Sequence, residues 1–376
     1  MDRPLAIGTG FRPIQQGLAE RLMCLHDEIK QDFGGLNRVA VAIYDQRSDI
    51  LRSYVHSSEG DNPFDHTVAR LADLKSLAEL ARTGGRRVIS DLIAHESSSP
   101  VHARRLISAG YLSSYTVPIF QKGTFYGFVF FNSFAKSYFT PQVVRGLKPI
   151  AEVVSLQTVM ELDAVRMIQG AVKTVRQISR VRDEETGTHL ERMSRYTRLI
   201  AQRLAPRRGM SDEWVEMLFQ FAPLHDVGKI AVPDQILFKP GRLTPEEFQI
   251  MQTHVDRGTE IINVMAETFR IGTAPYLQVL RNVVAHHHES LDGSGYPRGF
   301  SGDAVSLEGR IAAVADVFDA LTSTRPYKKA WSNDEAMAFL VEQAGRKFDP
   351  EAVDVLRQSP SAVADIQHQF AEAQLD

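Results

Sequence analysis

The sequence predicts an α+β N-terminal half, built on a central antiparallel sheet with helices, which a long helix joins to an all-helical C-terminal half. Between about Leu36 and Phe139, short β-branched and aromatic runs alternate with turn residues. Helical composition is continuous over residues 143–182. From Met167 onward the strand patterns cease, and proline and glycine mark loops between helical segments.

Length and composition are those of a globular protein. The chain has 376 residues, of which 43% are hydrophobic and 24% charged, enough for two or three domains of about 100–200 residues. The formal net charge of −3 gives no overall attraction to nucleic acid or anionic lipid. The single cysteine, Cys24, cannot form an internal disulfide, and no apolar run reaches the ~18 residues of a membrane span. We therefore expect a cytoplasmic protein without nucleic-acid or membrane partners.

Period-two and apolar runs define the expected N-terminal sheet. A turn at 45–49 separates the first two strands as a hairpin, and a second hairpin turns at 121–123. Residues 68–81 carry apolar side chains at helical spacing, and Gly84 and Gly85 follow as a stop signal. The expected strands cover residues 39–44, 50–55, 88–91, 114–120 and 125–131.

The linking helix has two apolar stripes. Steps of three and four join Ile150, Val153, Gln157, Met160, Ala164, Met167, Ala171, Thr174, Ile178 and Val181. A second stripe contains Leu162, Val165, Ile168, Val172 and Val175. The first pattern predicts the seam of a parallel homodimer. Packing of that face onto the C-terminal domain is the alternative, and the two stripes allow both uses.

Histidines and acids gather at five places in the second half. Glu185 and His189 are four residues apart and would share one face of a helix. Three histidines in succession, 286–288, follow an apolar helical run, so some of them must point inward. Asp316 interrupts an apolar helix, and a buried carboxylate needs a cation or a metal. The other places are the pair His225-Asp226 and the single His254.

These side chains form a metal-ligand set without thiolates. Imidazole and carboxylate suit iron, manganese or another borderline to hard ion better than a structural zinc site. An aspartate next to a histidine ligand, such as Asp226, can bridge two ions with its two oxygens. Ions about 3.5–4 Å apart are suited to phosphodiester cleavage. A P-loop at Gly228-Lys229 is excluded, because Pro223 stands where that motif requires glycine.

The order of the motifs resembles the HD-GYP domain over residues ~165–360. They are His225-Asp226-Val-Gly-Lys229, His254, His287-His288-Glu289, Leu291-Asp-Gly-Ser-Gly-Tyr-Pro297, and Ala315-Asp316-Val-Phe-Asp-Ala-Leu-Thr322 followed by Arg325-Pro-Tyr-Lys328. The resemblance implies an all-helical, metal-dependent phosphodiesterase of bacterial second-messenger signalling. It would cleave cyclic di-GMP to linear pGpG, with further cleavage to GMP as an extension of the same reaction.

The resemblance also implies roles for single residues. Asp226 and Lys229 would be catalytic, and Tyr296, Arg325 and Lys328 would bind the substrate. Glu185 resembles the glutamate of members that hold a third metal, so two or three ions are expected, iron first and manganese as the alternative. The implied metal ligands are Glu185, His189, His225, Asp226, His254, His287, His288 and Asp316. A cyclic-dinucleotide receptor without turnover, and a phosphodiesterase acting on cyclic GMP-AMP, remain as alternatives.

The N-terminal half resembles a GAF domain over residues ~20–150, through its strand order and a few residues in strands. These are Ile89-Ser90-Asp91, Thr116-Val-Pro-Ile119 and Gly127-Phe128. The resemblance implies a regulatory domain for an unknown small ligand, and a folded spacer that promotes dimerisation is equally compatible. We therefore expect a GAF-like domain at 1–150, a linking helix and dimer seam at 151–182, and an HD-GYP domain at 165–376.

Overall fold

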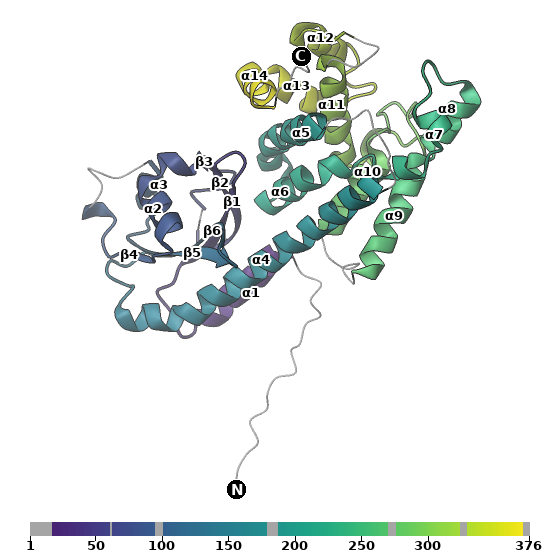
Figure 1. The fold of residues 1–376 in the computed structure, drawn as a ribbon. Helices are drawn as coiled ribbons and strands as arrows, with labels where there is room; N and C mark the ends of the chain where they lie inside the picture. Colours follow the sequence, from purple (N-terminus) through teal and green to yellow (C-terminus); the bar gives the residue numbers. More distant parts are fainter. Residues whose placement is uncertain are drawn as a thin grey trace.

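A computed structural model of the chain describes residues 17–60, 62–94, 101–178, 187–269, 276–323 and 329–370. A sheet with its helices lies at one side of the molecule and a helical body at the other (Figure 1). One long helix extends from beneath the sheet into the helical body. The predicted fold class, an α+β half followed by an all-helical half, is confirmed.

The N-terminal half is built on one six-stranded sheet of order β3-β2-β1-β6-β5-β4, in which every neighbouring pair is antiparallel. Both predicted hairpins are present, as β1 with β2 and as β5 with β6. The strands are β1 (Arg38–Asp45), β2 (Ile50–Ser58), β3 (Val68–Arg70), β4 (Arg87–Ile89), β5 (Ser113–Gln121) and β6 (Thr124–Ser133).

The two faces of this sheet pack against different helices. The apolar side chains of one face join a large core with α1 (Leu18–Ile29) and α4 (Pro141–Ile178). The other face packs against the 3-10 turn η1 (Leu71–Asp73) and α2 (Lys75–Thr83), with α3 (Val101–Ser108) nearby. Strand alternation sends neighbouring residues to opposite faces, so each strand serves both layers.

The helix predicted over 68–81 is wrong in its first part. Val68, Ala69 and Arg70 form β3 and pair with β2, and helix α2 begins only at Lys75. Periodicity along the chain cannot reveal this, because the hydrogen bonds of β3 come from a strand that lies far back in the sequence. The predicted stop is correct: α2 ends at Thr83, and Gly84 adopts the left-handed conformation (φ 69°) typical of a helix C-terminus.

Helix α4 uses its two apolar stripes differently. The buried side of the helix includes Leu162, Val165, Ile168 and Val172, which pack within the chain. On the opposite side, Val153, Met160 and Met167 repeat every seven residues and are 44%, 63% and 59% exposed. The helix begins at Pro141, ten residues before the start expected for the linker, and the side chain of Ile178 lies outside the described residues.

In the C-terminal half, the elements described are all helices, joined by loops. It contains α5 (Gly187–Arg208), α6 (Asp212–Phe221), η3 (Ala222–Leu224), η4 (Val227–Ala231), α7 (Asp234–Leu237), α8 (Pro245–Gln252), α9 (His254–Thr268), α10 (Tyr276–His286), η5 (Gly302–Ala304), α11 (Leu307–Thr322), α12 (Asn333–Glu342), α13 (Pro350–Arg357) and α14 (Pro360–Gln369). Among the helices described, none is long and apolar enough to cross a membrane.

Buried ion pairs connect the sheet to the helical half. Arg52 of β2 donates to Glu216 of α6 at 2.6 Å and lies 3.2 Å from Asp45 of β1. Arg198 of α5 lies 3.6 Å from Glu216 and 3.8 Å from Asp45, and its guanidinium covers the ring of Phe219. The sheet is thus held by charge to α5 and α6, the two helices that lead into the metal-ligand residues described below.

Candidate metal centre

Two groups of side chains converge in the helical half. The first contains Asp226, His254, His287 and His288, and the second contains His189, His225 and Asp316. Within each group, the atoms that could bind an ion lie within 4.8 Å of one another. His189, His254 and Asp316 lie on α5, α9 and α11, respectively. His225 and Asp226 lie at a chain reversal after η3, and His287 and His288 lie just after α10. All the His and Asp metal ligands predicted from the sequence are therefore brought together.

A very close backbone approach makes this convergence possible. Gly228, at the reversal that carries His225 and Asp226, lies directly against the start of α9. A Cβ atom at Gly228 would come within 1.8 Å of the carbonyl oxygen of His254 and 2.4 Å of the amide nitrogen of Gly258. Only glycine allows the two segments to meet so closely. The glycine two residues after Asp226 thus lets that carboxylate reach the imidazole of His254.

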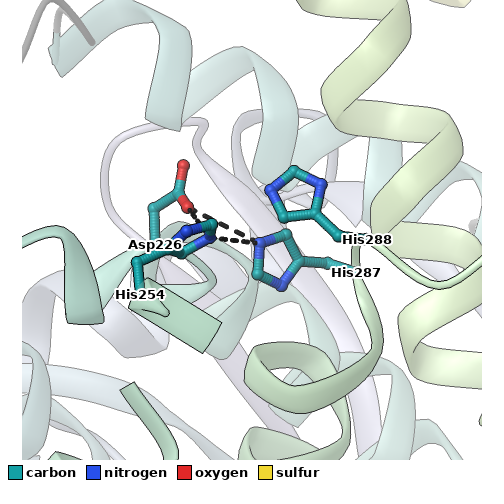
Figure 2. A group of neighbouring side chains, drawn as sticks. All are labelled: Asp226, His254, His287 and His288. Carbon is teal, nitrogen blue, oxygen red and sulfur yellow. Dashed lines mark hydrogen bonds and ion pairs between the residues drawn. The ribbon is translucent and has the colours of Figure 1, made fainter. Parts of the chain in front are cut away.

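The first group surrounds one oxygen of Asp226 (Figure 2). Asp226 Oδ1 lies 3.0 Å from His254 Nε2 and 3.5 Å from His287 Nε2, and these two nitrogens are 3.5 Å apart. The ring of His288 lies beside them, with its centroid 4.1 Å from that of His287 and 5.1 Å from that of His254. Three imidazoles and a carboxylate oxygen therefore face one small volume.

The second oxygen of Asp226 turns toward the other group. Asp226 Oδ2 lies 3.1 Å from His225 Nε2. Asp316 Oδ1 lies 3.9 Å from the same His225 atom and 3.6 Å from His189 Nε2. Asp226 thus offers one oxygen to each group, the arrangement in which a carboxylate can bridge two ions.

The ring orientation of the histidines leaves Nε2 as the atom directed to the centre. Nδ1 of His225, His254 and His287 donates to backbone carbonyl groups at 2.7–3.1 Å. Nδ1 of His189 donates to the carboxylate of Asp319 at 2.7 Å. An imidazole whose Nδ1 carries the proton has its lone pair on Nε2, and this is the tautomer that binds a metal.

Charge and burial fit a divalent ion. Burial lowers the pKa of His287 and holds the pKa of His288 well below its usual value, so both rings are neutral ligands near pH 7. Burial opposes the charge of Asp226, but Lys229 and His225 hold the pKa of this carboxyl well below its usual range. Asp226 Oδ1 is buried and has no hydrogen-bond partner in the described part of the chain. A buried, charged oxygen facing imidazole nitrogens is satisfied by a cation.

Two buried carboxylates support the site from outside. Asp319, one turn after Asp316 on α11, accepts from His189 Nδ1 and, at 2.6 Å and 3.0 Å, from two nitrogens of Arg192. Glu289 accepts from the backbone N–H groups of Arg298 and Phe300, and so fixes the loop after α10. No sequence pattern predicted a role for Asp319, Arg192 or Glu289. The sequence feature that could have revealed Asp319 is its position as a second aspartate, three residues after Asp316 in an apolar helix.

The remaining predicted site residues fall into two classes. Lys229 Nζ lies 2.6 Å from Asp226 Oδ2, and the ring of Tyr296 lies over His288 with centroids 4.6 Å apart. His286 turns away from the centre and accepts the backbone N–H of Ser306, as expected for a neighbour that is not a ligand. Glu185, Arg325 and Lys328 lie outside the described residues.

Residues 181–352 match the family model described as HD domain. This part of the chain is an HD domain. The match confirms the recognition made from the motifs, and membership implies binding of divalent metal at the His and Asp cluster. The HD domain thus contains both ligand groups together with Asp319, Arg192 and Glu289.

Curated relatives match about half of the chain. The cyclic di-GMP phosphodiesterase response regulator RpfG of Xanthomonas campestris is 46% identical over 192 residues, which are 51% of this chain and 48% of that protein. A cyclic di-GMP phosphodiesterase of Vibrio cholerae is 40% identical over 213 residues, 54% of this chain and 43% of the relative. The 3'3'-cGAMP-specific phosphodiesterase 2 of the same organism is 43% identical over 175 residues, 46% of this chain and 31% of the relative. The chain thus spans less than half the length of these relatives.

For the N-terminal half, the matching solved structures include a GAF domain region of a putative membrane protein from Geobacter sulfurreducens. It has 16% sequence identity and a TM-score of 0.29, and it covers 38% of this chain and 93% of that chain. The antiparallel sheet itself, with the order and pairing given above, is the observation that establishes the architecture of this half.

Proposed function

We propose that this chain is a metal-dependent phosphodiesterase that hydrolyses cyclic di-GMP to linear pGpG. The observation that carries the proposal is Asp226, whose two oxygens face two groups of mostly buried side chains that could bind metal ions. The relatives named cyclic di-GMP phosphodiesterases, at 46% and 40% identity over 192 and 213 residues, support the choice of substrate. Further cleavage to GMP is an extension of the same proposal.

The residues of the chain have separable tasks in this reaction. When bound, divalent ions supply positive charge to the phosphodiester and lower the pKa of water. Asp226 and Asp316 provide the negative charge that holds such ions. Lys229, whose ammonium lies 2.6 Å from Asp226 Oδ2, places a further positive charge at the edge of the site, where it can orient a phosphate oxygen. Tyr296 offers its ring beside His288 as a contact for the dinucleotide.

The donor set favours iron, with manganese as the alternative. Five imidazoles and two carboxylates surround the site without a thiolate. We propose Glu185 as a ligand of a third ion and Arg325 and Lys328 as phosphate contacts, on the basis of their sequence positions in the family pattern. The regions expected from the sequence are proposed unchanged, with a regulatory region at 1–150, a linker at 151–182 and a catalytic region at 165–376.

We also propose a homodimer joined along α4. The seven-residue repeat of exposed Val153, Met160 and Met167 supports it, because a monomer would leave this apolar stripe in water. The buried ion pairs of Arg52 and Arg198 would connect the N-terminal half, as a small-ligand sensor, to the helices of the metal site. The cytoplasmic location expected from the single cysteine is proposed likewise.

One relative favours a second candidate substrate. The 3'3'-cGAMP-specific phosphodiesterase 2 is 43% identical over its match, so cleavage of cyclic GMP-AMP is a specific alternative. A receptor without turnover is disfavoured, because such a protein does not need a complete ligand set, and here all seven His and Asp ligands converge.

To test the proposal, the protein is prepared without oxygen and the metal ions per chain are counted. Its turnover of both dinucleotides is then followed by chromatography in the presence of Fe(II) or Mn(II). We expect at least two ions per chain and formation of pGpG from cyclic di-GMP. His286→Gln is the matched control, since this neighbouring histidine points away from the ligands and should keep metal and activity. A metal-loaded preparation that binds cyclic di-GMP without cleaving it would establish the receptor instead.

A further inference from the structure

The second face of the N-terminal sheet contains a row of unusual residues. On β1, Arg38, Ala40 and Ala42 alternate with Val39, Val41 and Ile43 of the opposite, core-packed face. The pairing places Arg38 beside Asn132 of β6, and Arg87 of β4 beside Thr116 of β5. Two arginines therefore lie on strands of a sheet face that α2 and α3 cover.

Small residues at the centre of this face leave a cavity of about 120 Å³. Ala40, Ser114 and Thr116 form part of the sheet side, where larger side chains would fill the space. Apolar side chains provide most of the wall, namely those of Ala42, Leu51, Phe64, Leu74, Leu77, Leu92, Leu106 and Phe130. An engineered apolar cavity of about 150 Å³ binds benzene. The volume of the present cavity is of the same order, which suits a ligand with one small ring.

The ionisable side chains that line the cavity are all basic. They are Arg38, Arg52, Arg87 and His102, and among the described residues no acidic side chain lines the cavity. The guanidinium of Arg52 is paired with Asp45 and Glu216. Arg38 is buried and, within the described part of the chain, donates to the neutral amide oxygens of Asn62 and Asn132. Within the described residues, neither Arg38 nor Arg87 has a carboxylate at ion-pair distance.

Arg87 and His102 are the least satisfied of these groups. Nε of Arg87 and Nδ1 of His102 are buried atoms without a hydrogen-bond partner in the described residues. Burial lowers the pKa of Arg87, and burial with the nearby Arg87 charge lowers the pKa of His102 to about 4. His102 is therefore a neutral ring near pH 7, able to donate a hydrogen bond to an anion. A buried cation without a counterion is costly, and a bound anion removes that cost.

We propose that this cavity binds a small organic carboxylate whose apolar body occupies the Leu and Phe wall and whose carboxylate is held by Arg87 and His102. A guanidinium binds a carboxylate through two parallel N–H groups, which gives both charge and direction. The apolar wall excludes a fully hydrated anion such as inorganic phosphate. The inference names the chemistry of the sensor ligand and so rests on the proposed regulatory role of this half.

Calorimetric titration of the full-length chain tests the proposal without any measurement of turnover, so its failure is distinguishable from failure of the proposed phosphodiesterase. The probes are benzoate and cyclohexanecarboxylate, with benzamide as the uncharged counterpart of benzoate and inorganic phosphate as an anion without an apolar body. We expect both carboxylates to bind at least about tenfold more tightly than benzamide, and phosphate to show no heat of binding.

Arg87→Gln should weaken carboxylate binding by at least about tenfold. Arg82→Gln is the matched control, because Arg82 lies on the exposed surface of α2, where it pairs with Glu79. The carboxylate affinity of this variant should equal that of the parent. Without ligand, Arg87→Gln should melt no lower than the parent, since it removes a charge without a counterion. Equal binding of benzamide and benzoate, no binding of either carboxylate, unchanged affinity of Arg87→Gln, or a lower melting temperature of that variant would each overturn the proposal.

Discussion

Replacement of Asp319 by asparagine should weaken the metal site although Asp319 itself binds no ion. The carboxylate accepts from His189 Nδ1 at 2.7 Å, from Arg192 Nε and Nη2 at 2.6 and 3.0 Å, and from Ser323 Oγ at 3.1 Å. Asparagine keeps one acceptor oxygen and loses the charge, so it cannot hold both His189 and Arg192. The buried guanidinium of Arg192 then loses its ion pair with Asp319.

The size of the effect follows from these contacts. Removing one partner of a buried ion pair costs about 3–5 kcal/mol, and the oxygen that asparagine retains places this variant near the lower figure. Loss of the group that orients a metal-binding histidine typically costs 10–100-fold in metal affinity or activity. We therefore expect Asp319→Asn to fold, to unfold at a lower urea concentration, and to bind Mn(II) about 10–100-fold more weakly at the His189 group.

Urea unfolding monitored by circular dichroism and titration of the metal-free protein with Mn(II) measure the two effects separately. Asp354→Asn is the control, because Asp354 makes a comparable contact with Arg357 on the surface of α13. Its stability should change by less than about 0.5 kcal/mol and its metal affinity should not change. If Asp319→Asn matched the control in both measurements, the orienting role of Asp319 would be refuted.

Further changes have equally definite outcomes. Asp226→Ala should abolish turnover and deplete the metal in elemental analysis, and a folded, fully active variant would contradict the proposed site. Lysine at both Met160 and Met167 should give monomers in sedimentation, whereas an unchanged mass would exclude the α4 seam. Burial, reinforced by a neighbouring carboxylate, raises the pKa of Glu161 to about 7 from 4.5. The folded state therefore retains a proton that the unfolded state releases, and stability should fall by up to about 3 kcal/mol as pH rises from 4.5 to 7. Glu161→Gln should reduce that fall in urea midpoints, and an unchanged pH profile would contradict the assignment. Glu185→Ala should lower the metal count from three to two per chain, and a count equal to that of the parent would remove Glu185 from the site.

The sequence by itself determined the residue types of the site and the course of most elements. His225 and Asp226 are adjacent, so their proximity needs no fold, and alternation over short distances produced both hairpins correctly. Such information is local, because strand and helix periods are set by the backbone of each segment. The order of the ligand motifs along the chain can also be read from the sequence, because it does not depend on the fold.

The tertiary structure decided what each residue faces. Asp316 and Asp319 stand one turn apart on α11, yet one points toward the ligand groups and the other orients His189 from behind, because α5 packs along that side of the helix. His286 and His287 are adjacent in sequence, but α10 ends between them. As a result, His287 faces the ligand group and His286 faces Ser306.

The same physical reason applies to the N-terminal half. The pairing of β3 with β2 overrode the helical pattern at Val68–Arg70, because the hydrogen bonds of a strand come from a partner distant in sequence. The sequence places Arg38 and Arg87 in or beside strands, but it cannot show whether a carboxylate lies near either guanidinium, because that depends on the packing around each side chain. Only the packing of α2 and α3 over the sheet determined that these two cations share an apolar cavity.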